Sequence, residues 1–202
     1  RALAVAPNDV KLHKQLGATL DRIGLKSEAI KCMRGAVALD PTDIDSKIML
    51  RKLYTEVVPG WHFPMMNDTQ RNSAYDQAIR RAVKPGMHVL DIGTGAGLLS
   101  LMSARAGAKR VTTCEMVPEV AETATLIMAL NGVADRVTVI GKASTDLVVG
   151  KDLPDRADLL VSEVPSNDLL TEDVVRTITH ARTHLLKPGA PMVPRAIAVV
   201  TA

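Results

Sequence analysis

Aromatic residues are almost absent from this chain of 202 residues, which has one Phe, one Trp and two Tyr. The core must therefore be built from aliphatic side chains, and a hydrophobic content of 47% can supply them. Single-stranded nucleic acids are bound largely by stacking bases on aromatic rings, so we expect no such stacking surface. The formal net charge is only +3 and no dense basic block occurs, so direct nucleic-acid binding is not expected.

Cysteines and long apolar runs are also scarce. Cys32 and Cys114 lie far apart with no CxxC pattern, which predicts neither a disulfide framework nor a metal site. No apolar run reaches the length of a membrane-spanning helix and no signal peptide is recognisable, so a membrane is not expected as a partner. A reducing compartment fits these features, and we expect a cytoplasmic location, or a nuclear one in a eukaryote. Because Arg1 already stands within a repeat-like pattern, we interpret the sequence as part of a longer protein.

A repeat of 34 residues organises the beginning of the chain. Pro7 and Pro41 stand at this spacing in similar polar turns, and Leu16 and Leu50 share it. With small residues recurring between them, the pattern resembles the tetratricopeptide repeat, so we assign residues 1–56 to α-helical repeats of that kind. A plain helical hairpin is the alternative. A single repeat cannot bury its own apolar face, so this segment is expected to stack on further repeats or on the next domain.

Beyond the repeats the pattern changes to strands that alternate with helices. Residues 57–66 contain two Pro and one Gly, which is typical of a linker. We assign residues 67–194 to one α/β domain, whose first helix has Asn67 or Asp68 as its N-cap. The alternation predicts a parallel sheet wound by right-handed crossovers. We expect strands at 87–92, 110–114, 137–140 and 159–164, helices at 67–83, 98–105, 118–131 and 172–184, a loop at 188–194 and a further strand from 196.

A glycine-rich turn follows the first strand of this domain. Gly93, Gly95 and Gly97 come just after Asp91 at the strand tip and just before a helix, where glycine permits tight turning and close approach of a ligand. Glu115 ends the next strand, at the position where an acidic side chain accepts both ribose hydroxyls of a nucleotide. The alternative is a purely structural turn with Glu115 in solvent.

Two carboxylates flank a short loop after the fourth strand. Glu163 ends an apolar strand and is predicted to face the ligand crevice, and Glu172 follows nine residues later. Two carboxylates that grip a guanidinium by paired hydrogen bonds would draw its positive charge away from the reacting nitrogen and aim that nitrogen. The alternative for Glu172 is a structural role in the first turn of a helix that has Thr171 as its N-cap.

In combination these motifs resemble the class I S-adenosylmethionine methyltransferases and, among them, the protein arginine methyltransferases. The GxGxG spacing after Val-Leu-Asp-Ile is similar to motif I of the class rather than to the GxGxxG of NAD enzymes. Glu163 and Glu172 fall on the two positions of the family's double-glutamate hairpin. Arg71 and Tyr75 match an Arg that binds the cofactor carboxylate and a Tyr that lies over the site. Repeats ahead of the domain are similar to those of the tetratricopeptide-containing members.

The resemblance implies a Rossmann-like α/β fold with S-adenosylmethionine as cofactor, and it assigns roles to single residues. Glu163 and Glu172 are the implied catalytic residues, and Met65 and Tyr75 are placed on the substrate side. Ala143 and Ser144, after the third strand, lie where the family contacts adenine. The implied cofactor-binding residues are Arg71, Asp91, Gly93, Gly95, Gly97, Glu115, Ala143 and Ser144.

The implied activity is methyl transfer to arginine side chains of a protein substrate, which the repeats would recruit, in a protein compatible with a homo-oligomer. Family enzymes continue into a β-barrel with a Thr-His-Trp loop, and we interpret residues 195–202 as the start of this barrel. Because no Thr-His-Trp occurs here, the segment alone is expected to be inactive. The loop at 164–171 also lacks the aromatic residues common in the family. The alternatives are a methyltransferase of another substrate class and a non-catalytic repeat scaffold with a vestigial methyltransferase fold.

Overall fold

The computed structural model describes residues 4, 6–58, 60, 62–164 and 173–197. The chain divides into two compact units, residues 1–67 and residues 68–202. Within the described ranges, no helix combines the length and the apolar character that crossing a membrane requires.

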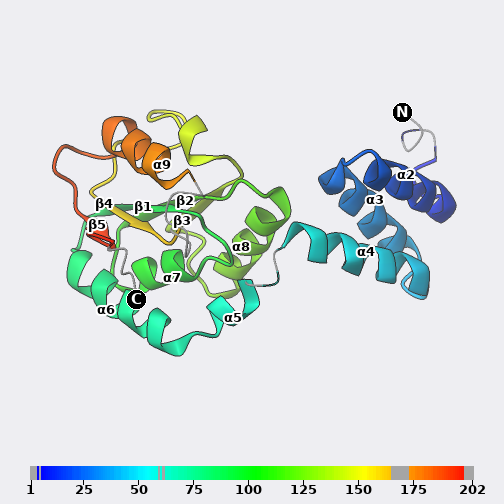
Figure 1. Cartoon of the computed structure of the whole chain (residues 1–202), viewed down its shortest axis with the longest axis horizontal. Coiled ribbons are helices and arrows are strands. Elements are labelled where there is room, and N and C mark those ends of the chain that lie inside the picture. The colour runs from blue at the N-terminus through cyan, green and yellow to red at the C-terminus, as the bar shows by residue number, and fades with distance from the viewer. Residues whose placement is uncertain (1–3, 5, 59, 61, 165–172, 198–202) are drawn as a thin grey trace, which may run out of the picture. The chain divides into compact units, whose positions relative to one another are not determined.

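The first unit consists of helices (Figure 1). Its described helices are α2 (Val10–Arg22), α3 (Lys26–Leu39), α4 (Ile44–Val57) and α5 (His62–Met66). Helix α3 packs against both α2 and α4 around a small core of Ala29, Ile30, Met33 and Leu53. Gly17 lets α2 approach α3 closely, because a Cβ there would lie 2.7 Å from Cε of Met33, whose side chain would have to move. The assignment of these helices to tetratricopeptide repeats stays a prediction.

The segment expected to be a linker, residues 57–66, contains more structure than predicted. Helix α4 continues to Val57, and α5 forms within the segment. Pro64 lies in the first turn of α5, where a proline is tolerated because the first backbone N–H groups of a helix have no partner within it.

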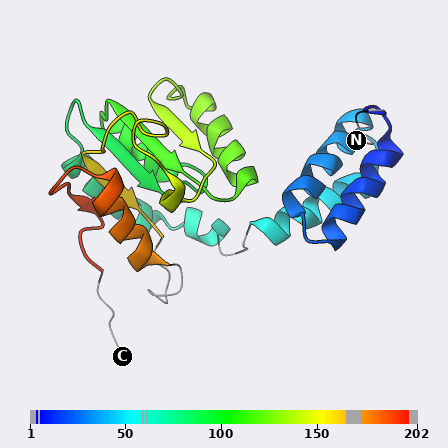
Figure 2. The same cartoon turned by 90° about the horizontal axis from the view of Figure 1, so that it is seen from above.

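The second unit contains a five-stranded sheet whose strands are all parallel, in the order β3-β2-β1-β4-β5. The strands are β1 (His88–Ile92), β2 (Arg110–Cys114), β3 (Val137–Ile140), β4 (Leu159–Ser162) and β5 (Met192–Val193). Helices α6 (Thr69–Ala82), α7 (Leu98–Arg105) and α8 (Pro118–Leu130) cover one face, and α9 (Val174–His180) covers the other (Figures 1 and 2). The predicted α/β fold with a parallel sheet is thereby confirmed.

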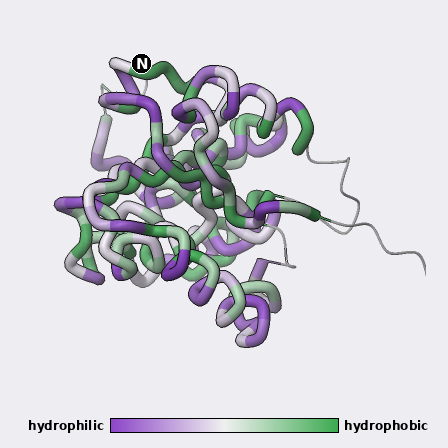
Figure 3. The backbone as a smooth tube through the Cα atoms, turned by 90° about the vertical axis from the view of Figure 1, so that its left-hand side faces the viewer, coloured by the Kyte–Doolittle hydropathy of each residue, from purple (hydrophilic) through white to green (hydrophobic). Residues whose placement is uncertain are grey.

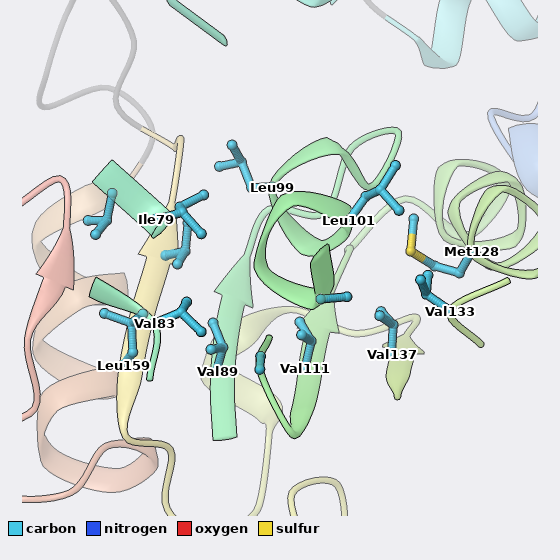
Figure 4. Packing of buried hydrophobic residues seen from close by; sticks show 14 residues of the cluster. Ile79, Val83, Val89, Leu99, Leu101, Val111, Met128, Val133, Val137 and Leu159 are labelled. Atoms are coloured by element: carbon cyan, nitrogen blue, oxygen red, sulfur yellow. The ribbon is translucent and has the colours of Figure 1, made fainter. Parts of the chain in front are cut away.

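Two apolar cores lie on the two faces of this sheet, because successive side chains of a strand point in opposite directions. Val89 of β1 and Leu159 of β4 belong to the core beneath α6, α7 and α8 (Figure 4). Leu90 and Leu160, one position further on, belong to the core beneath α9. Strands buried on both faces are rich in apolar residues. This explains the green, hydrophobic segments near the centre of the view in Figure 3.

Several predicted boundaries were wrong towards the end of the chain. Strand β4 ends at Ser162, so Glu163 follows the strand and is not part of it. The loop expected at 188–194 contains β5, which pairs with β4 through only two residues and is too short to recognise by periodicity. Helix α9 ends at His180 and continues as a π-helical turn, Ala181–Leu185. Ala196 and Ile197 have no regular structure, and the rest of the strand expected there lies outside the described residues.

Replacement of Leu159 by alanine should lower the free energy of unfolding by about 3 kcal/mol, because the side chain is fully buried beneath the helical layer and truncation leaves a cavity. Leu130→Ala is the matched control, since Leu130 at the end of α8 is 86% exposed. Urea unfolding of both variants measures the difference. An equal decrease in the free energy of unfolding for both variants would show that Leu159 of β4 is not part of the stabilising core.

Candidate active site

The carboxyl ends of the parallel strands meet at one edge of the sheet, where ligands bind in folds of this kind. The strand order reverses direction between β1 and β4, which are neighbours although β2 and β3 lie between them in sequence. The glycine turn leaves β1 at this point, and Glu163 follows β4 on the adjacent strand. The fold therefore brings together the two groups of residues that the sequence predicts to be functional.

The turn after β1 has a backbone that requires glycine. Gly93, Gly95 and Gly97 have φ angles of +83°, +51° and +85°, in the region that L side chains rarely adopt. A Cβ on Gly97 would lie 2.4 Å from Cε of Met128, and one on Gly93 would lie 3.2 Å from Val164. The turn thus lies close against α8 and the segment after β4, and a larger side chain would displace it.

Glu115, at the end of β2, holds the glycine turn in place. Its Oε2 accepts a hydrogen bond from the backbone N–H of Gly95 at 3.0 Å, and its Oε1 accepts one from Val117 at 3.0 Å. Glu115 therefore lies beside the turn with both carboxylate oxygens bound to backbone N–H groups, rather than free in solvent. Each carboxylate oxygen keeps a second lone pair for a ribose hydroxyl, a role that stays a prediction.

Asp91, expected at the strand tip, lies one residue before the end of β1 and is fully buried. Its Oδ2 accepts hydrogen bonds from Ser100 Oγ at 2.5 Å and from Thr113 Oγ1 at 3.2 Å. Thr113 in turn accepts from Thr94 of the glycine turn at 2.6 Å. Burial raises the pKa of Asp91 to about 7, and the nearby charge of Glu115 also raises it. Oδ1 is buried and has no hydrogen-bond partner among the described residues, which is unusual for a buried acceptor.

The hydroxyl groups around Asp91 were not predicted from the sequence. Ser100 lies in the otherwise apolar first turn of α7, and Thr113 lies between Thr112 and Cys114 in the buried part of β2; both are completely buried. A small polar residue within a buried apolar segment needs a hydrogen-bond partner, and this was the available signal.

Arg71 and Glu163 form a two-pronged ion pair between α6 and the end of β4. Arg71 Nε donates to Glu163 Oε1 at 3.1 Å, and Nη2 lies 2.8 Å from Oε2. Asp68, the N-cap of α6, accepts from the backbone N–H of Arg71 at 2.9 Å and so fixes the start of the helix. The predicted cofactor arginine and the predicted catalytic glutamate therefore contact each other directly.

Tyr75 lies one turn further along α6 and belongs to the same cluster. Its ring centre is 5.4 Å from the guanidinium carbon of Arg71, and its hydroxyl donates to the carbonyl oxygen of Ser162 at 3.2 Å. Burial, together with the negative charge of Glu163, raises the pKa of Tyr75 to about 12. Tyr75 is consequently neutral at physiological pH and acts as a hydrogen-bond donor beside Glu163.

For the remaining predicted residues, the described part of the structure gives no contact with this cluster. Ser144 is buried and begins a short 3₁₀ turn, Ser144–Asp146, after β3, with Ala143 preceding it as N-cap. Met65 lies in α5 of the other unit, so its assignment to the substrate side stays a prediction. Glu172 lies outside the described residues, and its pairing with Glu163 is likewise a prediction.

An apolar cavity of about 320 Å³ lies beside this edge of the sheet and was not predicted. Both neighbours of Glu163, Ser162 and Val164, line it, together with residues of α9 and β5. Within the described ranges, no three His, Cys, Asp or Glu side chains are grouped closely enough to hold a metal ion.

Comparison with known proteins gives a consistent set of matches. The family model described as ribosomal protein L11 methyltransferase (PrmA) matches residues 74–193. An arginine N(omega)-methyltransferase of Streptomyces achromogenes subsp. streptozoticus is 50% identical over 139 residues, which are 69% of this chain and 38% of that protein. Protein arginine N-methyltransferase 9 of Mus musculus is 36% identical over 187 residues, 92% of this chain and 22% of that protein. The chain thus spans well under half the length of these relatives.

Solved structures agree with the sequence matches. The Trypanosoma brucei PRMT1 enzyme-prozyme heterotetrameric complex with AdoHcy superposes with a TM-score of 0.61 at 30% identity, covering 68% of this chain and 43% of that one. Arabidopsis thaliana protein arginine methyltransferase 10 superposes with a TM-score of 0.58 at 32% identity, covering 64% of this chain and 36% of that one.

Asp91 should make the stability of the protein depend on pH. In the unfolded chain this carboxyl loses its proton near its ordinary pKa of 3.8, whereas in the folded protein it does so near 7. Between these values the folded state binds more protons, so stability falls as the pH rises and levels off above about 7. We expect the melting temperature of the unmodified protein to fall over this range relative to that of Asp91→Asn. Asp135→Asn, at an exposed position, is the control, and parallel curves for all three proteins would contradict the raised pKa.

Proposed function

Because the chain belongs to the protein arginine N-methyltransferase family, we propose that the protein transfers a methyl group from S-adenosylmethionine to arginine side chains of a protein substrate. One observation carries this proposal: Glu163, at the ligand edge of the sheet, binds a guanidinium group through both of its oxygens. A carboxylate that binds two nitrogens of the planar Arg71 guanidinium has the geometry to bind the guanidinium of a substrate arginine in the same way.

The residues at the sheet edge fit the cofactor. The glycine turn permits close approach of a ligand to its backbone, and Asp91 has a buried acceptor without a partner in the described part of the chain. In our proposal Asp91, Glu115 and the glycines hold the nucleoside and the amino acid part, Ala143 and Ser144 lie beside adenine, and Arg71 binds the carboxylate. The cofactor supplies a methyl group on a positively charged sulfur, which is open to in-line attack.

Glu163 contributes orientation and charge. The nitrogens of a guanidinium are poor nucleophiles because its positive charge is delocalised over all three. A carboxylate that accepts two of its hydrogen bonds draws the positive charge towards itself and holds the remaining nitrogen in one direction. A nucleophile held in line with the methyl group reacts faster than one that must find this orientation. Glu172 is proposed to hold the other side of the same guanidinium.

Free arginine is the second candidate substrate. The Streptomyces relative, 50% identical over its match, is named an arginine N(omega)-methyltransferase without reference to a protein. The chemistry at Glu163 would be the same for both, because the carboxylate recognises the guanidinium and not the backbone that carries it. We favour the protein substrate because the relatives that match more than nine-tenths of this chain are named protein arginine methyltransferases.

Glu163→Gln should lower the rate of methyl transfer by roughly a hundredfold or more, because it keeps the size of the side chain and removes the charge that orients the guanidinium. The measurement is transfer of labelled methyl groups by the full-length protein to an arginine peptide, to the same peptide with lysine in place of arginine, and to free L-arginine.

The arginine peptide should be the best acceptor. Faster methylation of free L-arginine would establish the second candidate. Equal methylation of the lysine peptide, or an undiminished rate in the variant, would reject the role of Glu163.

We further propose that the helices of the first unit recruit the protein substrate. Helical repeats commonly bind partners on their concave face. Deletion of residues 1–56 should then weaken methylation of a folded protein substrate at least several-fold and leave the rate with a short arginine peptide nearly unchanged. The comparison of kcat/KM for both acceptors tests this, and equal effects on both would count against recruitment.

A further inference from the structure

The guanidinium of Arg71 binds the carboxylate of Glu163 in the way that the guanidinium of an arginine substrate would. Its Nε and Nη2 face the two oxygens of Glu163 at 3.1 and 2.8 Å, which is the paired geometry expected for a bound guanidinium. The carboxylate that is proposed to orient the substrate is thus already engaged by an arginine of the same chain.

Neighbouring side chains hold Arg71 in this position. Asn72 Oδ1 accepts from Nη1 at 2.7 Å, and the ring of Tyr75 lies 5.4 Å from the guanidinium carbon. Only 19% of the Arg71 side chain and 22% of the Glu163 side chain are exposed. The ion pair is therefore partly shielded from water, and its attraction is stronger than that of a fully exposed pair.

Two negative groups compete for the single positive charge of Arg71. One is Glu163, and the other is the carboxylate of the cofactor that Arg71 is proposed to bind. While Arg71 stays on Glu163, a substrate guanidinium would have to share one carboxylate with a second positive charge. Once Arg71 turns to another anion, the full negative charge of Glu163 is available to the substrate.

We propose that Arg71 is a positioning residue that couples the two halves of the site, an inference that rests on the proposed function. In the cofactor-free protein it covers Glu163, and when the cofactor binds it leaves Glu163 for the cofactor carboxylate. Substrate guanidinium binding is therefore favoured after cofactor binding. Linkage requires the converse as well: the pairing of Glu163 with Arg71 weakens cofactor binding by the same factor by which it weakens substrate binding.

The test uses two ligands that share the adenosine and the thioether sulfur and differ in the amino acid part. S-adenosylhomocysteine carries the amino acid carboxylate, whereas 5′-methylthioadenosine has the adenosine and a methylthio group but no carboxylate. Isothermal calorimetry on the purified protein gives the Kd of each ligand for the unmodified protein, Glu163→Gln, Arg71→Gln and the double variant. Binding of 5′-methylthioadenosine also reports whether each variant is folded.

Glu163→Gln should tighten S-adenosylhomocysteine binding about five- to tenfold, at the lower end of typical coupling between sites. It should leave the Kd of 5′-methylthioadenosine unchanged. In the Arg71→Gln background the same substitution should have almost no effect, since the coupling acts through Arg71. Simple repulsion between Glu163 and the ligand carboxylate would persist in that background, so the double variant separates the two causes.

The outcomes also separate this inference from the proposed function. If the unmodified protein binds S-adenosylhomocysteine but Glu163→Gln weakens its binding or leaves it unchanged, the coupling is wrong and the proposed function stands. The coupling is also wrong if the Kd of 5′-methylthioadenosine changes by the same factor, or if the double variant keeps the full effect. If the full-length unmodified protein binds neither ligand, the proposed function fails, and the inference fails with it.

Discussion

The parallel alignment of β1 and β4 is the constraint on which the site depends. Parallel strands all end at the same edge of the sheet, so the glycine turn after β1 and Glu163 after β4 must lie side by side. Both faces of such a sheet are covered by helices, and the strands are accordingly apolar along most of their length. The carboxylate side chains of the candidate site therefore lie at or just beyond the carboxyl ends of β1, β2 and β4, and Asp91 is the one among them that is fully buried.

Three carboxylates meet at this edge, with Arg71 paired to one of them. Each is stabilised in a different way: Glu115 by backbone N–H groups, Asp91 by hydroxyl groups and Glu163 by the guanidinium of Arg71. Asp91 has hydrogen bonds from neutral groups only and is fully buried, and its pKa rises accordingly.

The sequence predicted the centre of the domain better than its end. The boundaries of β2, β3 and α7 were correct to the residue, because a glycine or proline, or an abrupt change in periodicity, marks each of them. Strand β5 was missed because two residues carry no periodicity, and its pairing with β4 is a tertiary contact. The Arg71–Glu163 pair could not be predicted either, since 92 residues separate its members and both were assigned to other partners.

The site therefore has a fixed half and an adjustable half. Around Asp91 and Glu115, buried hydrogen bonds connect the glycine turn to β2 and α7, and moving any one group would leave a buried polar atom without a partner. Arg71 and Glu163 are only partly shielded from water, and each has a long, rotatable side chain that can leave one oppositely charged partner for another. Such a division suits a transferase with two substrates: the cofactor meets a preformed surface, and the second substrate meets a carboxylate whose partner can change.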